Sequence, residues 1–74
     1  MIISDPDIMM GKPIVQGTRI TVELILEKLA ARHSMSQILA AHPRLTQESI
    51  DEAIDYAVKV LKSETVLPLT KKTA

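Results

Sequence analysis

The hydrophobic positions of this chain follow two different spacings, and the change falls near residue 20. Before it, apolar residues come in short pairs, Ile2–Ile3 and Ile14–Val15, among two prolines and both glycines of the chain. β-Branched pairs favour extended backbone, whereas proline and glycine oppose helix. Gln16–Gly17 suits a tight turn, from which Thr18–Ile20 would return as a further short strand. We therefore expect a β-element here, called the N-terminal arm.

From Thr21 onward the spacing becomes that of amphipathic helices. Thr21 suits the N-cap of a first helix, and Arg32 and His33 at its end complement the helix dipole. A capping box, Ser34-x-x-Gln37, predicts the start of a short second helix. The apolar faces of these two helices are Val22, Ile25, Leu26, Leu29 and Ala30, then Met35, Ile38 and Leu39. Pro43 ends the second helix, because the residue before a proline avoids helical backbone.

The third helix carries the longest apolar stripe of the chain. Thr46 is its expected N-cap, and Leu45 and Ile50 stand at the two positions of a hydrophobic staple. Acidic residues crowd its first half, and two lysines lie in its second half, an order that suits the helix dipole. We expect the acidic residues to form a solvated face and the stripe to belong to the core. The stripe consists of Ile50, Ala53, Ile54, Ala57, Val58 and Leu61.

These patterns predict a mainly α fold, in which a short N-terminal β-element precedes a three-helix, helix-turn-helix-like bundle. We expect a single domain over residues 1–62, with the β-arm at 1–20 and three helices in 21–62. Residues 63–74 form a C-terminal tail with few features that would fix its structure. We expect this tail to be poorly ordered by itself.

Composition excludes several classes of protein. The 74 residues include no cysteine, which rules out disulfides, a thiol nucleophile and cysteine-based zinc sites. Apolar runs are short and interrupted by charge, so no transmembrane helix is expected, and the first residues lack the basic region of a signal peptide. We expect a cytoplasmic protein with no membrane partner. Its small aliphatic core and the strand edges of the arm predict a homodimer held partly by that arm.

Candidate sites for chemistry have structural explanations. The Gly11-Lys12-Pro13 stretch lacks the spacing and the hydroxyl residue of a phosphate-binding loop. His33 and His42 lie at helix ends with no other ligand at metal-binding spacing. Serines fall near helix starts, where capping accounts for them. We therefore predict no catalytic residue, cofactor or metal, and a protein that is not an enzyme.

An ordered string of motifs is more specific. The chain reads GKPIVQGTRITV from Gly11, then a leucine-rich helix, MSQIL from Met35, HPRLT from His42 and AIDYA from Ala53. Over about residues 5–58 this order resembles the bacterial domain-of-unknown-function family numbered 433. The resemblance implies a homeodomain-like helix-turn-helix shape; many members are encoded beside a PIN-like ribonuclease and are regarded as VapB-type antitoxins. The family commonly has proline where this chain has Thr21, and the tail lies outside the shared pattern.

The function that this resemblance implies is a non-enzymatic antitoxin-like module that binds and restrains a PIN-like ribonuclease, with autoregulatory DNA binding as a secondary role. Two alternatives remain open: a free-standing helix-turn-helix DNA-binding regulator, and a dimerisation adaptor with no nucleic-acid role. Tyr56 and Val60, beside the apolar stripe, either complete the core or face another subunit. With them, the candidate partner-binding residues are those of the tail: Val66, Leu67, Leu69, Lys71 and Lys72.

DNA contacts are not expected from the start of the third helix, because its four carboxylates would repel phosphates. Basic residues elsewhere are the candidates: Lys12, Arg19, Arg32 and Arg44. For Arg19 the favoured alternative is a structural ion pair with Asp5 or Asp7.

Overall fold

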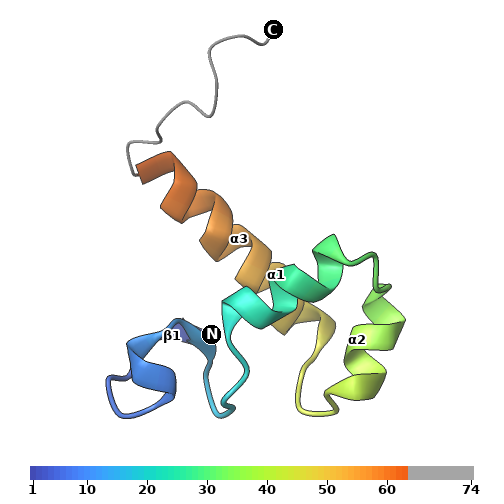
Figure 1. Ribbon diagram of the computed structural model, residues 1–74, viewed down its shortest axis with the longest axis horizontal. Coiled ribbons are helices and arrows are strands. Elements are labelled where there is room, and N and C mark those ends of the chain that lie inside the picture. The colour runs from blue at the N-terminus through green and yellow to red at the C-terminus, as the bar shows by residue number, and fades with distance from the viewer. Residues whose placement is uncertain (64–74) are drawn as a thin grey trace, which may run out of the picture.

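The computed structural model describes residues 1–63 as a small two-stranded sheet followed by three helices (Figure 1). The strands are β1 (Ile2–Ile3) and β2 (Ile14–Val15), with a short 3-10 turn at Met9–Gly11 between them. The helices are α1 (Val22–Ala30), α2 (Met35–Ala41) and α3 (Gln47–Ser63). This architecture confirms the predicted fold class. The tail residues predicted to bind a partner lie outside the described residues.

The arm folds back on itself. β1 and β2 are antiparallel, with Ile2 opposite Val15 and Ile3 opposite Ile14. The expected turn is present: the Thr18 N–H donates to the Val15 carbonyl at 3.0 Å, and Gly17 has a φ of +83°, which glycine adopts readily.

The further strand predicted at Thr18–Ile20 is absent. The Thr18 hydroxyl bonds locally, to the Val15 carbonyl and to the Ile20 N–H, and so curls this segment. The chain returns to the sheet only as a single bridge between Ile14 and Thr21. Two backbone hydrogen bonds flank this bridge, from the Val15 N–H to the Ile20 carbonyl and from the Val22 N–H to the Pro13 carbonyl, and local side-chain bonding keeps the pairing from extending further.

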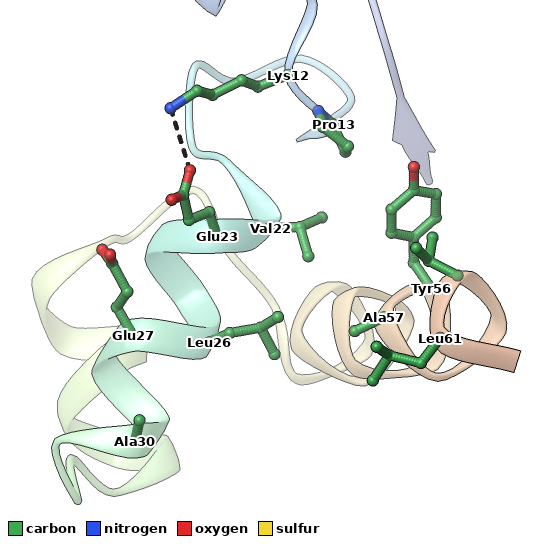
Figure 2. Close-up of a pocket in the computed structure, with 11 residues that line it drawn as sticks. Lys12, Pro13, Val22, Glu23, Leu26, Glu27, Ala30, Tyr56, Ala57 and Leu61 are labelled. Carbon is green, nitrogen blue, oxygen red and sulfur yellow. Dashed lines mark hydrogen bonds and ion pairs between the residues drawn. The ribbon is translucent and has the colours of Figure 1, made fainter. Parts of the chain in front are cut away.

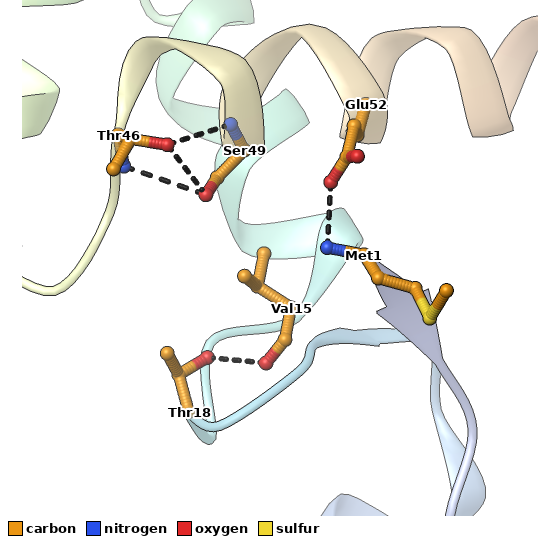
Figure 3. A network of polar contacts seen from close by, with 6 residues as sticks. All are labelled: Met1, Val15, Thr18, Thr46, Ser49 and Glu52. Carbon is orange, nitrogen blue, oxygen red and sulfur yellow. Dashed lines mark hydrogen bonds and ion pairs between the residues drawn. The ribbon is translucent and has the colours of Figure 1, made fainter.

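Each helix begins at the cap that the sequence predicts. The Thr21 side chain accepts a hydrogen bond from the backbone N–H three residues later. Ser34 and Gln37 form a capping box, with bonds of 3.1 and 2.7 Å. At α3, the Ser49 N–H donates to the Thr46 hydroxyl at 3.1 Å (Figure 3). These caps satisfy N–H groups that have no partner inside the helices, and they set where α1, α2 and α3 start.

The core lies where the helices and the arm meet. α1 packs against α2 and α3, and β1 packs against α3. Arm residues are as deeply buried as helix residues: Ile14 and Val15 are 1% and 4% exposed. The buried apolar set is Ile14, Val15, Val22, Ile25, Ile38, Leu45, Ile50 and Ala53. The arm is therefore part of the core.

The apolar stripe of α3 is fully buried only at its first two positions. Ile50 and Ala53 are fully buried, whereas Ile54, Val58 and Leu61 are 37%, 44% and 63% exposed. The prediction that the whole stripe belongs to the core is therefore wrong. α3 has 17 residues and α1 has 9, so the second half of α3 runs on past the body (Figure 1).

Candidate functional site

An open apolar groove lies between α1 and the second half of α3 (Figure 2). Its volume is about 630 Å³. Pro13 of the arm lies at one end, and the walls are Val22, Leu26 and Ala30 from α1 and Tyr56, Ala57, Val60 and Leu61 from α3. We call this feature the α1–α3 groove. An apolar hollow of this kind is typical of a binding surface.

Charges on the rim of the groove belong to the arm and to α1. Lys12 Nζ lies 3.1 Å from Glu23 Oε1, and Glu27 follows one turn later on α1. Both members of the Lys12–Glu23 pair are more than half exposed, so it adds little stability. Its consequence is that Lys12, a candidate DNA contact, already has a carboxylate partner.

A second apolar surface lies beside the groove. Ile54, Val58 and Leu61 form an exposed line along α3, which we call the α3 ridge. Leu61 belongs to both features, because it also lines the groove. Contiguous exposed apolar surface on a small domain marks an interaction site more often than isolated exposed residues do.

The structure brings Tyr56 and Val60 together in the α1–α3 groove. Both are half-buried, and Tyr56 also packs against the core cluster. Tyr56 therefore completes the core with one part of its ring and lines the groove with another. The partner-binding role of Tyr56 and Val60 stays a prediction.

Arg19 and Arg44 line a shallower hollow beside the arm turn. Arg44 Nη1 donates to the Gly17 carbonyl at 3.0 Å, which ties the α2–α3 connector to the arm. The predicted pairing of Arg19 with Asp5 or Asp7 is wrong: within residues 1–63 Arg19 makes no ion pair. Asp5 instead accepts a hydrogen bond from the Asp7 backbone N–H, a local turn that holds its carboxylate.

Arg32 stands apart from the other candidate DNA contacts. It follows α1 with a φ of +69°, the left-handed conformation at which glycine commonly ends helices. Its N–H donates to the Leu29 carbonyl, and the His33 N–H donates to the Lys28 carbonyl. Arg32 thus shapes the turn between α1 and α2, while Lys12, Arg19 and Arg44 surround hollows near the arm.

The acidic face of α3 is largely in solvent, as predicted. Glu48, Asp51 and Asp55 are exposed. Asp55 pairs with Lys59 at 2.9 Å, and Glu52 lies 2.7 Å from the Met1 amino group (Figure 3). Two of the four carboxylates are therefore held in surface ion pairs, and Glu48 and Asp51 are exposed to solvent.

Among residues 1–63, no three histidine, aspartate or glutamate side chains are grouped to hold a metal ion. His33 is exposed, and His42 Nε2 is buried with no hydrogen-bond partner in the described part of the chain. The same residues contain no helix with the length and apolar character needed to cross a membrane.

The sequence did not predict that a groove would open beside α3. It did contain a relevant signal, since the apolar stripe of the third helix, from Ile50 to Leu61, is longer than that of the first, from Val22 to Ala30. A long stripe packed against a short one leaves its far end uncovered.

Together, the three-helix body, the short β-arm and the uncovered apolar surface define a small helical module with room for a macromolecular partner. The chain belongs to the family described as "Protein of unknown function (DUF433)", which it matches over residues 2–57. This match confirms the family resemblance.

A relative described as "Uncharacterized protein y4eO", from Sinorhizobium fredii, is 42% identical over 57 residues. That match covers 77% of this chain and 26% of the relative, so the chain spans about a quarter of the relative's length. No solved structure matches the chain.

Proposed function

We propose that this chain is a non-enzymatic antitoxin-like module that binds and restrains a PIN-like ribonuclease, principally through residues 64–74. The observation that carries the proposal is the uncovered apolar surface of α3. Its second half extends past the body, and apolar side chains stay uncovered as far as Leu61, close to segment 64–74 in the sequence. The partner class comes from the family resemblance.

The chemistry of segment 64–74 suits such a partner. A short segment loses conformational freedom on binding, and apolar anchors offset that cost. Val66, Leu67 and Leu69 supply the anchors around a stiffening proline. Lys71 and Lys72 supply cations for the acidic metal-binding site of a PIN-like nuclease.

Autoregulatory DNA binding is a secondary proposal, and one observation favours it. The Arg19 guanidinium has no ion pair within residues 1–63, and Arg44 lies on the same hollow. A free-standing DNA regulator is less well supported, because the first turns of α3 present carboxylates where a recognition helix would approach phosphates.

The test is co-purification of the tagged chain with the product of the neighbouring nuclease gene. Deleting residues 64–74 should abolish co-purification and leave the thermal melt almost unchanged. A finer variant is Leu67→Asp with Leu69→Asp, matched by Thr70→Asp with Thr73→Asp, which adds the same charge without removing an anchor. Retention of the nuclease by the deleted form would contradict this assignment and move the interface to Tyr56 and Val60.

A further inference from the structure

The α3 ridge adjoins the α3 wall of the α1–α3 groove, so a wide apolar face at this end of α3 is exposed or half-buried. A wide apolar surface of this kind on a small domain marks an interaction site. We propose that a second copy of this chain covers both surfaces, with the α3 ridge of each copy seated in the α1–α3 groove of the other. This inference goes beyond the proposed function: it assigns the groove to a homodimer and leaves residues 64–74 for the nuclease.

The arrangement of the two surfaces suits a two-fold contact. A symmetric dimer uses the same patch on both copies, so the patch must be complementary to itself. Here a convex ridge and a concave groove lie side by side on α3 and share Leu61. Because Leu61 belongs to both halves of the patch, it lies close to the two-fold axis of such a dimer.

Charges around the patch are also complementary between two copies related by a two-fold axis. The α1 side of the groove carries Glu23 and Glu27, while the end of α3 that would enter it carries Lys59 and Lys62. Within residues 1–63, neither Glu27 nor Lys62 makes an ion pair. A partner copy would bring Lys62 to the rim on which Glu27 lies, where opposite charges favour the correct orientation.

The size of the surface favours a second copy over other occupants. A stable interface buries about 1,600 Å² in total. The three ridge side chains of one copy cover only a fraction of that area, but a two-fold contact uses the ridge and the groove twice. A single extended segment laid in the groove would leave Ile54 and Val58 uncovered, since neither lines it.

The proposed dimer uses a different surface from the one that the sequence suggested for self-association. That prediction relied on strand edges in the arm, but β1 and β2 pair with each other, and Ile14 and Val15 are buried within one copy. The uncovered half of α3 is the larger apolar surface that still needs a partner.

The first test is a disulfide cross-link in the full chain, which contains no cysteine of its own. Leu61→Cys should form a covalent dimer rapidly under mild oxidation, because the two residues meet near the axis. Ala40→Cys, exposed on α2, is the matched control and should link at the slow rate of random collision. Equal linking rates for the two variants, or no linking at position 61, would overturn the proposal.

The second test is sedimentation equilibrium over micromolar to sub-millimolar concentrations. Val58→Glu should weaken dimerisation by at least about tenfold, since it places a charge in an apolar contact. Ala40→Glu adds the same charge on α2 and should leave the dimer unchanged. Circular dichroism verifies that both variants stay folded. A wild-type chain that is monomeric throughout, or a Val58→Glu variant that dimerises normally, contradicts the inference.

A charge exchange gives an orientation test. Lys62→Glu and Glu27→Lys should each weaken the dimer several-fold, and the double variant should recover part of the loss if the two side chains face each other across the interface. Absence of any recovery would rule out this orientation. The nuclease experiment can still be interpreted if the dimer is lost, because it deletes residues 64–74 and measures co-purification.

Discussion

The two halves of α3 carry the same apolar periodicity and have opposite surroundings. In the first half, Ile50 and Ala53 are fully buried beneath α1 and the arm. In the second half, Val58 and Leu61 are 44% and 63% exposed. Periodicity reports which face of a helix is apolar, but what covers that face depends on the length of the neighbouring elements. Here α1 is too short to cover all of α3.

The difference shows that one helix can have two environments. Its first half packs in the core of the domain, while its second half, with the same residue types, leaves apolar surface exposed. Exposed apolar surface of this kind is the basis of the dimer proposed above.

The largest expected effect separates the two halves directly. Ile50→Ala should lower the free energy of unfolding by about 2–5 kcal/mol, because it opens a cavity in a fully packed site. Ile54→Ala removes the same atoms one turn later, from a side chain that is 37% exposed, and should cost about 1 kcal/mol or less. Urea denaturation at low protein concentration measures both. Similar losses would mean that the start of the α3 ridge is packed within one copy.

A smaller effect is expected at the start of α3. Thr46→Ala should cost about 1 kcal/mol, because it removes the hydroxyl that accepts from the Ser49 N–H. Thr46→Ser keeps that oxygen and is the matched control. The same denaturation experiment applies, and a cost shared by both variants would assign the loss to the threonine methyl group.

The smallest effects should come from the acidic face. Asp51→Ala and Glu52→Ala should each change the free energy of unfolding by no more than about 0.5 kcal/mol, since surface charges are well solvated. Glu52→Ala is the more stringent test of this prediction, because the Glu52 carboxylate lies 2.7 Å from the Met1 amino group. A decrease in the free energy of unfolding of more than about 1 kcal/mol at either position would show that the acidic face contributes to the fold.

Sequence rules that involve residues only a few positions apart predicted most of the fold. The caps at Thr21, Ser34 and Thr46 depend on residues three positions apart, so the sequence contains both partners. The strand predicted at Thr18–Ile20 is reduced to a single bridge at Thr21, because the Thr18 hydroxyl bonds to nearby backbone and curls the segment, a competition that β-propensity does not include.

The candidate site was less predictable, because it depends on how elements are placed in space. Tyr56 and Val60 were identified from their position beside the stripe, and both line the groove. The sequence predicted that Leu26 and Leu61 belong to the core. Both line the groove instead, because a sequence does not show where α1 stops covering α3. For Arg19, charge alone suggested a nearby carboxylate, but Asp5 is held in its own turn.

The burial of the arm has a consequence for how the domain opens. An N-terminal arm is usually the first part of a domain to detach, because few contacts hold it. Here Val15 belongs to the same core cluster as Val22 and Ile25 of α1, Ile14 beside it is buried, and the Val15 N–H donates to the Ile20 carbonyl at 3.0 Å. Lifting the arm would therefore expose the core itself, so strand pairing and helix packing are lost together as one cooperative unit.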